Sequence, residues 1–548
     1  MNSTINYSFK NKNYYKKVSF SIIKYIFICL FLIFVAYSFF TLNFQLSSNG
    51  LSLFLLRIKK IFSFEQNNNY ENYIFTTFKF TLKTVQYTSL GTLIGFLFAI
   101  LTAFLSSKTF HKNLLLVYLI KVFVLILRSI PVLVVLEILR NGFGDILQAT
   151  LVLSWFTWLW AHKYLEDIFE NSDYNTFKNN IFLGKNKWIS FFKNVNNSYK
   201  NKIIVLFLYS FESNIRWTSI LSSAGLFGLG YFLQGKNTLD YKYIGIPLLW
   251  LTITLLINEL IGIFLNKIIF FQKALDKKTK FSKRIFLRPT LYFWILSIIY
   301  LSLAISVLFI INYKDININL FYSTFGKYLD IDFIYIKENI YKLFISVYDI
   351  LKISSIAIFI SYLLSLFIAY LGNNIIGNKY NILLIKLFLL ICRIIPSVIV
   401  FILFNMFFNR FEIPILIVMI FSSTRAMAKF FIESLNSVYS VGLSNMIKTK
   451  YFSKTKIFFK YILPNAKNEI ISFAFYRFEN VFRSMISFGA LSTIGIGYIL
   501  SNVANLKIEE ADSRVSAISF VIMIFIILIE LINIFYKIFY DKRTFKKK

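Results

Sequence analysis

Long apolar stretches, separated by short basic segments, run along almost the whole chain of 548 residues. Each stretch is about 20 residues long or longer, which is the length that a helix needs to cross a bilayer. We expect six spans in each half, at about 18–41, 79–106, 113–139, 144–163, 203–234 and 243–267, and again at about 290–312, 347–371, 380–408, 412–432, 466–500 and 515–536. The pattern therefore predicts an all-α polytopic membrane protein with about 12 transmembrane helices.

A charged and aromatic segment occurs twice, at equivalent places in the two halves. Tyr209-Ser-Phe-Glu-Ser-Asn-Ile-Arg216 returns as Tyr476-Arg-Phe-Glu-Asn-Val-Phe-Arg483, 267 positions later. A Gly-x-Gly-Tyr step follows each copy at the same spacing. Because each half has an even number of spans, the two copies share one orientation in the membrane. We therefore expect two tandem six-helix repeats, related by an axis along the membrane normal.

Basic residues concentrate in the N-terminal tail, in a link between the halves and in the C-terminal tail. With six spans per half, all three segments lie on one side, which the positive-inside rule identifies as the cytoplasm. One outer segment, with Arg57, Lys59 and Lys60, goes against the rule. The first apolar stretch is too long for a signal-peptide core and is interpreted as a retained helix. We expect a multi-pass plasma-membrane protein with both termini cytoplasmic.

The net charge of +34 is of the size found in nucleic-acid-binding proteins. The basic residues lie between apolar stretches, however, so no nucleic-acid partner is expected. The two cysteines, Cys29 and Cys392, and the two histidines, His111 and His162, have no companions at metal-ligand spacing. We expect no metal and no cofactor.

Two acid–base pairs fall within predicted spans. Glu212 and Arg216, like Glu479 and Arg483, are four residues apart and share one face of a helix. Pairing lowers the cost of insertion, which is about 2.5–3.5 kcal/mol for a single charge at the centre of a span. Two interpretations stay open: structural ion pairs between neighbouring helices, or residues that line or gate a pathway between the halves.

Glycines and prolines also recur at matched positions. Arg128-Ser-Ile-Pro131 returns as Arg393-Ile-Ile-Pro396, where each proline is expected to kink a span. The arginines could bind an anion or hydrogen-bond the carbonyls that the kink frees. The Gly-x-Gly steps are expected to serve close packing or hinge motion, and they comprise Gly228, Gly230, Gly495 and Gly497.

A third repeat lies at the cytoplasmic ends of the fourth and tenth spans. Lys163, Asp167 and Glu170 match Lys429, Glu433 and Asn436, 266 positions later. Long polar stretches follow, at about 164–202 and 433–465, and the second ends in Leu463-Pro464. Because these polar stretches occur at the same topological position in both halves, docking of a cytoplasmic partner is favoured over a solvated loop without a partner. The sequence contains no Walker A motif, so ATP hydrolysis by a P-loop of this chain is excluded.

The Tyr-x-Phe-Glu-x-x-x-Arg element followed by Gly-x-Gly resembles the membrane subunit of phosphonate-type ABC importers, within the binding-protein-dependent permease family. The Arg-x-Ile-Pro element is found there in the same order, and the double length resembles high-affinity transport permeases of mycoplasmas. The resemblance covers 79–267 and 347–537. It implies that residues 79–267 form the first permease repeat and residues 347–537 the second. Residues 1–78 would form a tail, the first span and an outer loop, and residues 290–346 would form the seventh span and an outer loop. Residues 268–289 would be a basic cytoplasmic linker, and residues 538–548 a basic cytoplasmic tail.

The resemblance also implies partners and a mechanism. Two separate ATPase subunits would bind the duplicated cytoplasmic loops, and an extracellular binding protein, expected to be lipid-anchored, would deliver a small solute. Gly184, Leu463 and Pro464 fit the family's coupling loop, whereas Lys178-Asn179 and Asn445-Met446 stand where the family has Glu-Ala, and Tyr451 stands where it has Gly. The ATPase contact is therefore expected to be altered and asymmetric.

The substrate class stays open between a phosphonate-like molecule and another phosphorylated or cationic molecule, such as a thiamine-type ligand. A secondary transporter with six plus six parallel spans is the first alternative, and Glu137, Glu259 and Glu530 are its candidate coupling acids. A structural or assembly protein of the membrane is the second. A structural or assembly role, however, does not explain why charged pairs repeat within the spans.

Overall fold

The computed structural model describes residues 19–111, 113–170, 174–195, 200–233, 241–270, 289–436, 438, 453–489, 492–506 and 510–544. These residues form helices and connecting loops, and the described part of the chain contains no β-strand beyond an isolated bridge between Leu46 and Phe408. The prediction of an all-α polytopic membrane protein is confirmed.

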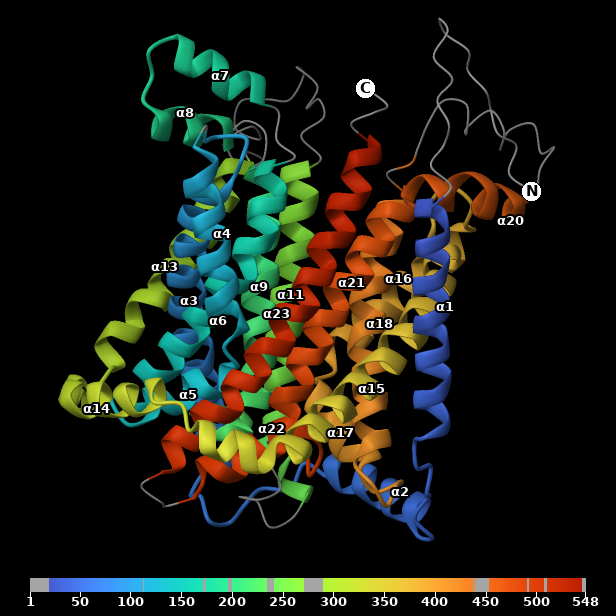
Figure 1. Ribbon diagram of the computed structural model, residues 1–548. Helices are drawn as coiled ribbons and strands as arrows, with labels where there is room; N and C mark the ends of the chain where they lie inside the picture. The colour runs from blue at the N-terminus through green and yellow to red at the C-terminus, as the bar shows by residue number, and fades with distance from the viewer. Residues whose placement is uncertain are drawn as a thin grey trace, which may run out of the picture.

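Figure 1 shows most of the helices running roughly along one common direction. The first half contains α1 (Ser19–Phe40), α2 (Gly50–Ile61), α3 (Tyr73–Ser106), α4 (Leu114–Ser129), α5 (Val132–Arg140), α6 (Asp145–Glu170), α7 (Tyr174–Phe182), α8 (Lys187–Asn194), α9 (Lys200–Leu221), α10 (Gly230–Leu233) and α11 (Gly245–Phe270). The second half contains α13 (Pro289–Ile310), α14 (Ile318–Leu329), α15 (Phe333–Gly372), α16 (Lys379–Ile394), α17 (Ser397–Phe404), α18 (Glu412–Asn436), α20 (Lys454–Ile457), α21 (Leu463–Phe488), α22 (Gly495–Ala504) and α23 (Ala511–Thr544).

Length and composition identify five described helices as membrane spans, or seven if each of two bent pairs counts as one span. The bends lie at the predicted prolines: α4 and α5 meet at 75° around Pro131, and α16 and α17 meet at 80° around Pro396. Helices α6, α9 and α21 carry more polar residues and fall outside this count, although they run beside the others (Figure 1). The total of 12 spans stays a prediction.

Small residues bring the long helices of each half close together. In α3, a side chain at Gly95 would collide with the carbonyl oxygen of Ser154 in α6. In the second half, Ser361 of α15 donates a hydrogen bond to the carbonyl oxygen of Ile420 in α18, at 3.2 Å. Close backbone approach through small or hydroxyl residues is the usual way in which helices associate inside a membrane.

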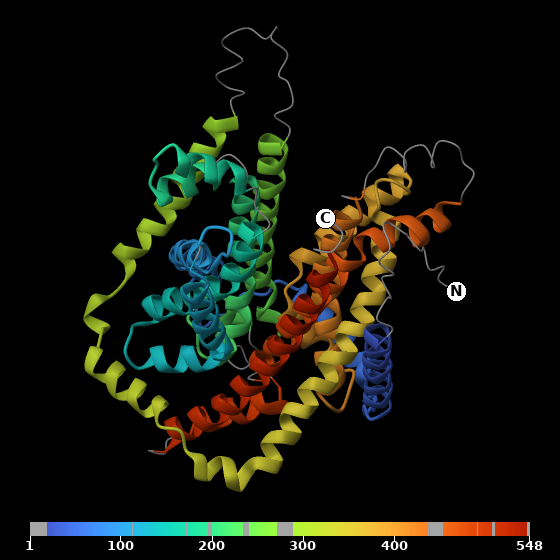
Figure 2. The ribbon, with the colours of Figure 1, turned by 45° about the horizontal axis from the view of Figure 1, so that its top comes forward.

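The first helix of each half packs against the other half. Helix α1 contacts α15, and α13 contacts α3. Both views show α1 beside the yellow and orange helices of the second half, and α13 beside the blue and green helices of the first (Figures 1 and 2). The connecting helices α2 and α14 lie at the end of the molecule opposite α7 and α8 (Figure 1). The two halves are therefore interlocked.

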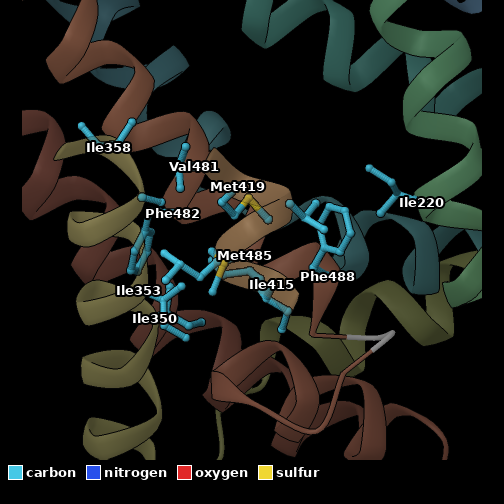
Figure 3. Packing of buried hydrophobic residues seen from close by; sticks show 14 of the residues in the cluster. Ile220, Ile350, Ile353, Ile358, Ile415, Met419, Val481, Phe482, Met485 and Phe488 are labelled. Carbon is cyan, nitrogen blue, oxygen red and sulfur yellow. The ribbon is translucent and has the colours of Figure 1, made fainter. Parts of the chain in front are cut away.

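The largest apolar cluster of the described residues lies mainly in the second half. It includes Ile350 and Ile353 of α15, Met419 of α18, and Phe482 and Met485 of α21 (Figure 3). In Figure 3, Phe488 lies between this cluster and Ile220 of α9, which comes from the first half. The core therefore continues across the boundary between the halves.

Candidate functional site

A cavity of about 630 Å³ lies between the two halves. Its first-half wall consists of residues from α6 and α9 and from the bend between α4 and α5. Its second-half wall consists mainly of residues from α18 and α21, with contributions from α16, α17 and α23. At the end of α9 away from Lys202, the lining residues Ile220, Met419 and Phe488 belong to the buried apolar core.

Glu479 is the centre of the first of two buried ion clusters. Its carboxylate lies 2.8 Å from Arg128, 3.1 Å from Lys163 and 2.8 Å from Arg483. Glu530 of α23 shares two of these cations, at 2.7 Å from Arg128 and 3.0 Å from Lys163. Only 2% of Glu479 and 7% of Glu530 are exposed, so each charge relies on its partners rather than on solvent.

Glu212 is the centre of the second cluster. Its carboxylate pairs with Arg216 on the next turn of α9 and lies 2.5 Å from Arg393 of α16. Glu259 of α11 pairs with the same Arg393, at 2.7 Å. Glu212 is 4% and Arg393 9% exposed.

The two clusters cross the boundary between the halves in opposite directions. In the first, cations of the first half bind carboxylates of the second half; in the second, Arg393 of the second half binds carboxylates of the first. The predicted pairs four residues apart do form, on α9 and on α21. Each glutamate also binds the arginine that precedes the proline bend of the opposite half, which the sequence did not indicate.

The carbonyls at the ends of the bent helices have different donors from those expected. Arg483 donates to the carbonyl oxygen of Arg128, at the end of α4. Arg425 of α18 donates to the carbonyl oxygens of Cys392 and Ile395, at 3.0 and 2.9 Å. Arg128 and Arg393 are thereby left to bind carboxylates.

The predicted glycines lie where the chain folds back after α9 and α21. Gly228 and Gly495 have positive φ angles of 153° and 76°. A side chain at Gly230 would collide with Ser222, and one at Gly497 with the carbonyl oxygen of Ile486. These contacts agree with the packing interpretation, and hinge motion stays a prediction.

The residues expected to form the cytoplasmic coupling loops separate into two groups. Lys163 belongs to the Glu479 cluster, and Lys429 and Glu433 line the cavity. The others lie nearer the helix ends. Glu170 pairs with Lys121 at 2.7 Å, and Asp167 lies in the same last turns of α6. Asn436 accepts a hydrogen bond from the backbone of Asn374. Gly184 lies between α7 and α8, and Leu463 and Pro464 begin α21. The departures expected at Asn445, Met446 and Tyr451 lie outside the described residues.

Two acids of the ion clusters, Glu259 and Glu530, were expected only as coupling acids of the secondary-transporter alternative. They occupy the last long helix of each half but are 271 positions apart, so a search at the offset of 267 does not pair them. Two arginines that line the cavity were not predicted as site residues. Arg425 and Arg477 have no counterpart in the first half, where Leu159 and Ser210 stand at the equivalent positions. The described residues contain no group of three His, Cys, Asp or Glu side chains that could hold a metal ion.

Comparisons with known proteins match the chain to membrane transport components. The family described as binding-protein-dependent transport system inner membrane component matches residues 383–545. ABC transport system permease protein p69 of Mycoplasma genitalium is 25% identical over 497 residues, which is 88% of each chain. The p69 protein of Mycoplasma pneumoniae is 27% identical over 468 residues, 83% of this chain and 84% of that one.

A chain of the MetNI methionine ABC transporter in inward-facing conformations aligns with 35% of this chain and 94% of its own length. Its sequence identity to this chain is 15% and the TM-score is 0.31. The sequence relatives are permeases, which are transport components rather than enzymes. The chain is therefore similar over most of its length to ABC transport system permeases, and its residues 383–545 match the binding-protein-dependent transport system inner membrane component family.

Proposed function

We propose that this chain is the membrane-spanning permease subunit of an ABC importer and that it supplies both halves of the pore. The observation that carries the proposal is the cavity between the halves, with a buried ion cluster on each side. Charged groups inside a membrane protein are costly and usually mark a pathway for a substrate or ion. The interlocked helices α1 and α13 support a pore built from a single chain.

The ion clusters are suited to control the pathway. Each joins helices of both halves, so a relative movement of the halves has to break or exchange these pairs. Removing one partner of a buried pair typically costs about 3–5 kcal/mol, because the other charge is left uncompensated. Energy of this size has to come from outside the chain, and ATP binding to separate subunits would provide it.

Two ATPase subunits would dock on the cytoplasmic face, one on each half. In the first half, α7 and α8 project beyond the helix bundle (Figure 1). Phe182 and Leu183, at the turn between them, are 75% and 74% exposed. Exposed apolar side chains on a projecting turn are typical of a docking surface. An external binding protein, expected to be lipid-anchored, would deliver the substrate to the opposite face.

The charges of the cavity favour an anionic substrate. Eight Lys or Arg side chains line it against two carboxylates, Glu433 and Glu479. Three further carboxylates, Glu212, Glu259 and Glu530, pair with the lining arginines, which leaves an excess of three positive charges. A phosphonate-like or phosphorylated molecule would be attracted, whereas a ligand that is only cationic, such as unphosphorylated thiamine, would be repelled.

The secondary-transporter alternative is less well supported. A carboxylate that couples transport to protons needs to exchange them, but Glu259 and Glu530 are held in short pairs with arginine or lysine. Uptake that survives ATP depletion and collapses with an ionophore would favour this alternative.

Purification from native membranes in mild detergent tests the proposal. We expect the chain to bring with it an ATPase that has Walker motifs, together with a lipid-anchored binding protein. Recovery of the chain alone, in several detergents and at native expression, would contradict an ABC importer.

A further inference from the structure

The two walls of the cavity differ chemically, although they are built from equivalent helices. Trp160 faces the cavity from α6, but Ala426 occupies the matching place on α18, 266 positions later. On α9, Trp217 corresponds to Ser484 of α21, 267 positions later. A chain that carries both halves can vary them separately, so the two walls can recognise different parts of one substrate.

The second-half wall holds positive charges that are not in direct contact with a carboxylate, although Glu433 and Glu259 act on Lys429 electrostatically. Within the described part of the chain, Arg425, Lys429 and Arg477 form no ion pair with a carboxylate. Part of the Arg425 guanidinium is already engaged, because it donates to the carbonyl oxygens of Cys392 and Ile395 and to the Ser397 hydroxyl, so Lys429 and Arg477 are the freer pair. The Nε atom of Arg477 is buried and has no hydrogen-bond partner. Arginine forks and lysine ammonium groups without carboxylates are suited to bind a phosphoryl or carboxylate group.

The first-half wall is the richer in aromatic rings and holds all three tryptophans of the cavity. It contains the rings of Trp155, Phe156, Trp160, Tyr164, Tyr209 and Trp217, against Phe430, Phe473, Tyr476 and Phe488 in the second half, and it carries three of the eight cations. Phe156 and Trp217 lie 5.3 Å apart, measured between ring centroids, and Trp160 and Tyr209 lie 5.5 Å apart. The indole nitrogen of Trp155 is buried without a hydrogen-bond partner. Such a wall can stack against a planar ring and offer it one donor.

Tyr209 joins the two walls. Its ring contacts Trp160, and it lies within electrostatic range of cations from both halves, namely Arg477, Arg216, Arg393 and Lys429. A molecule that spans this junction would therefore meet aromatic rings at one end and positive charges at the other. The cavity volume of about 630 Å³ lies within the range of about 300–1,000 Å³ found for small-molecule sites.

We propose that the cavity binds an organic anion that carries a planar ring, and that it holds this substrate in one orientation. The anionic group lies against Arg425, Lys429 and Arg477, and the ring lies against Trp155, Trp160 and Trp217. The inference deepens the proposed function, because it assumes that the cavity is the translocation pathway.

Binding of three small probes to the purified full-length chain tests the inference. Equilibrium dialysis against empty micelles would compare phenyl phosphate, benzyl alcohol and inorganic phosphate. We expect phenyl phosphate to bind at least about tenfold more tightly than either of the others, because only it engages both walls. Equal affinity for phenyl phosphate and inorganic phosphate, or no binding of phenyl phosphate, would overturn the proposal.

Substitutions by the residue of the opposite half separate the two walls. Arg477→Ser should weaken phenyl phosphate and inorganic phosphate alike, by about tenfold. Trp217→Ser should weaken phenyl phosphate to the level of inorganic phosphate and leave the latter unchanged. Arg410→Ser, at an exposed position, is the matched control and should change neither. Arg477→Gln and Trp160→Ala replace a variant that fails to fold. Unchanged binding in the variants of either wall would contradict the site.

The outcome is separable from that of the proposed function. If the chain purifies with its ATPase but the probes show no two-walled preference, the substrate inference fails and the importer stands. If the preference is found and no ATPase accompanies the chain, the site stands and the importer fails.

Discussion

At the scale of single residues, the features of greatest consequence are the glutamates that bind across the boundary between the halves. Glu212 and Glu479 were recognisable in the sequence, because they recur with an arginine four residues later. Their partners Arg393 and Arg128 were recognisable as residues of a second repeat, but nothing in a linear pattern joins the two repeats. The crossing depends on tertiary structure, which packs α4 against α23 and α16 against α11 and α18 and so brings Arg128 to Glu479 and Arg393 to Glu212.

Glu530→Gln should destabilise the protein, because Lys163 would lose one of its two carboxylate partners and Arg128 would retain only Glu479. Hydrogen bonds to charged groups typically contribute about 1.5–3 kcal/mol, and we expect a loss of that size. Thermal unfolding in detergent measures it. Arg514→Gln, which breaks the more exposed pair with Glu510, is the control and should cost less than about 1 kcal/mol. Equal effects of the two substitutions would contradict the account.

His111 should make stability depend on pH. It lies in the loop between α3 and α4, where burial and the nearby Lys187 lower its pKa below the usual value. The unfolded chain therefore binds a proton more readily than the folded chain, so stability should fall as pH drops through about 6.5. Melting temperatures of the native chain and of His111→Gln, compared from pH 8 to 5.5, measure the difference. Parallel curves for the two proteins would contradict this assignment.

At the scale of helices, close packing through small residues matters more than apolar content. Gly91 and Gly95 of α3 face backbone atoms of α6, whereas Gly262 of α11 has open space around it. Sequence reasoning located the long apolar helices and both proline bends. It did not predict that α1 and α13 pack against the opposite halves, because an apolar face does not specify which helix it contacts.

Gly95→Ala should separate α3 from α6, since the added carbon would meet the carbonyl oxygen of Ser154. Overpacking of this kind typically costs about 1–3 kcal/mol. Gly262→Ala is the matched control in another membrane helix, and it should be neutral or slightly stabilising. The folded yield and melting temperature of the two variants provide the comparison, and a tolerated Gly95→Ala would exclude this packing role.

At the scale of the whole molecule, two chemically different halves are interlocked around one cavity. The duplication was visible in the sequence, and so was the charged character of its centre. The asymmetry of the walls became visible only when the structure identified which residues of α6, α9, α18 and α21 face the cavity. In the sequence alone, the replacement of Arg425 by Leu159 at the equivalent position of the first half is one of many differences between the diverged repeats.

The exchange of α1 and α13 predicts that the halves recognise each other without a covalent link. Residues 1–277 and 278–548, expressed as separate chains, should associate, because α1 would still pack on α15 and α13 on α3. Co-purification of the two fragments from membranes measures this. Deletion of residues 1–40 from the first fragment should weaken the association, and fragments that never co-purify would contradict the interlocked arrangement.

The central claim is that the crossed ion clusters govern passage between the halves, and ATP-driven uptake by the double variant Glu212→Gln with Glu479→Gln tests it most directly. The measurement needs the reconstituted complex with its ATPase and binding protein. We expect uptake to be abolished while membrane insertion and ATPase association persist, and Glu338→Gln, at an exposed position, to leave uptake unchanged. Undiminished uptake by the double variant would return both glutamates to a purely structural role.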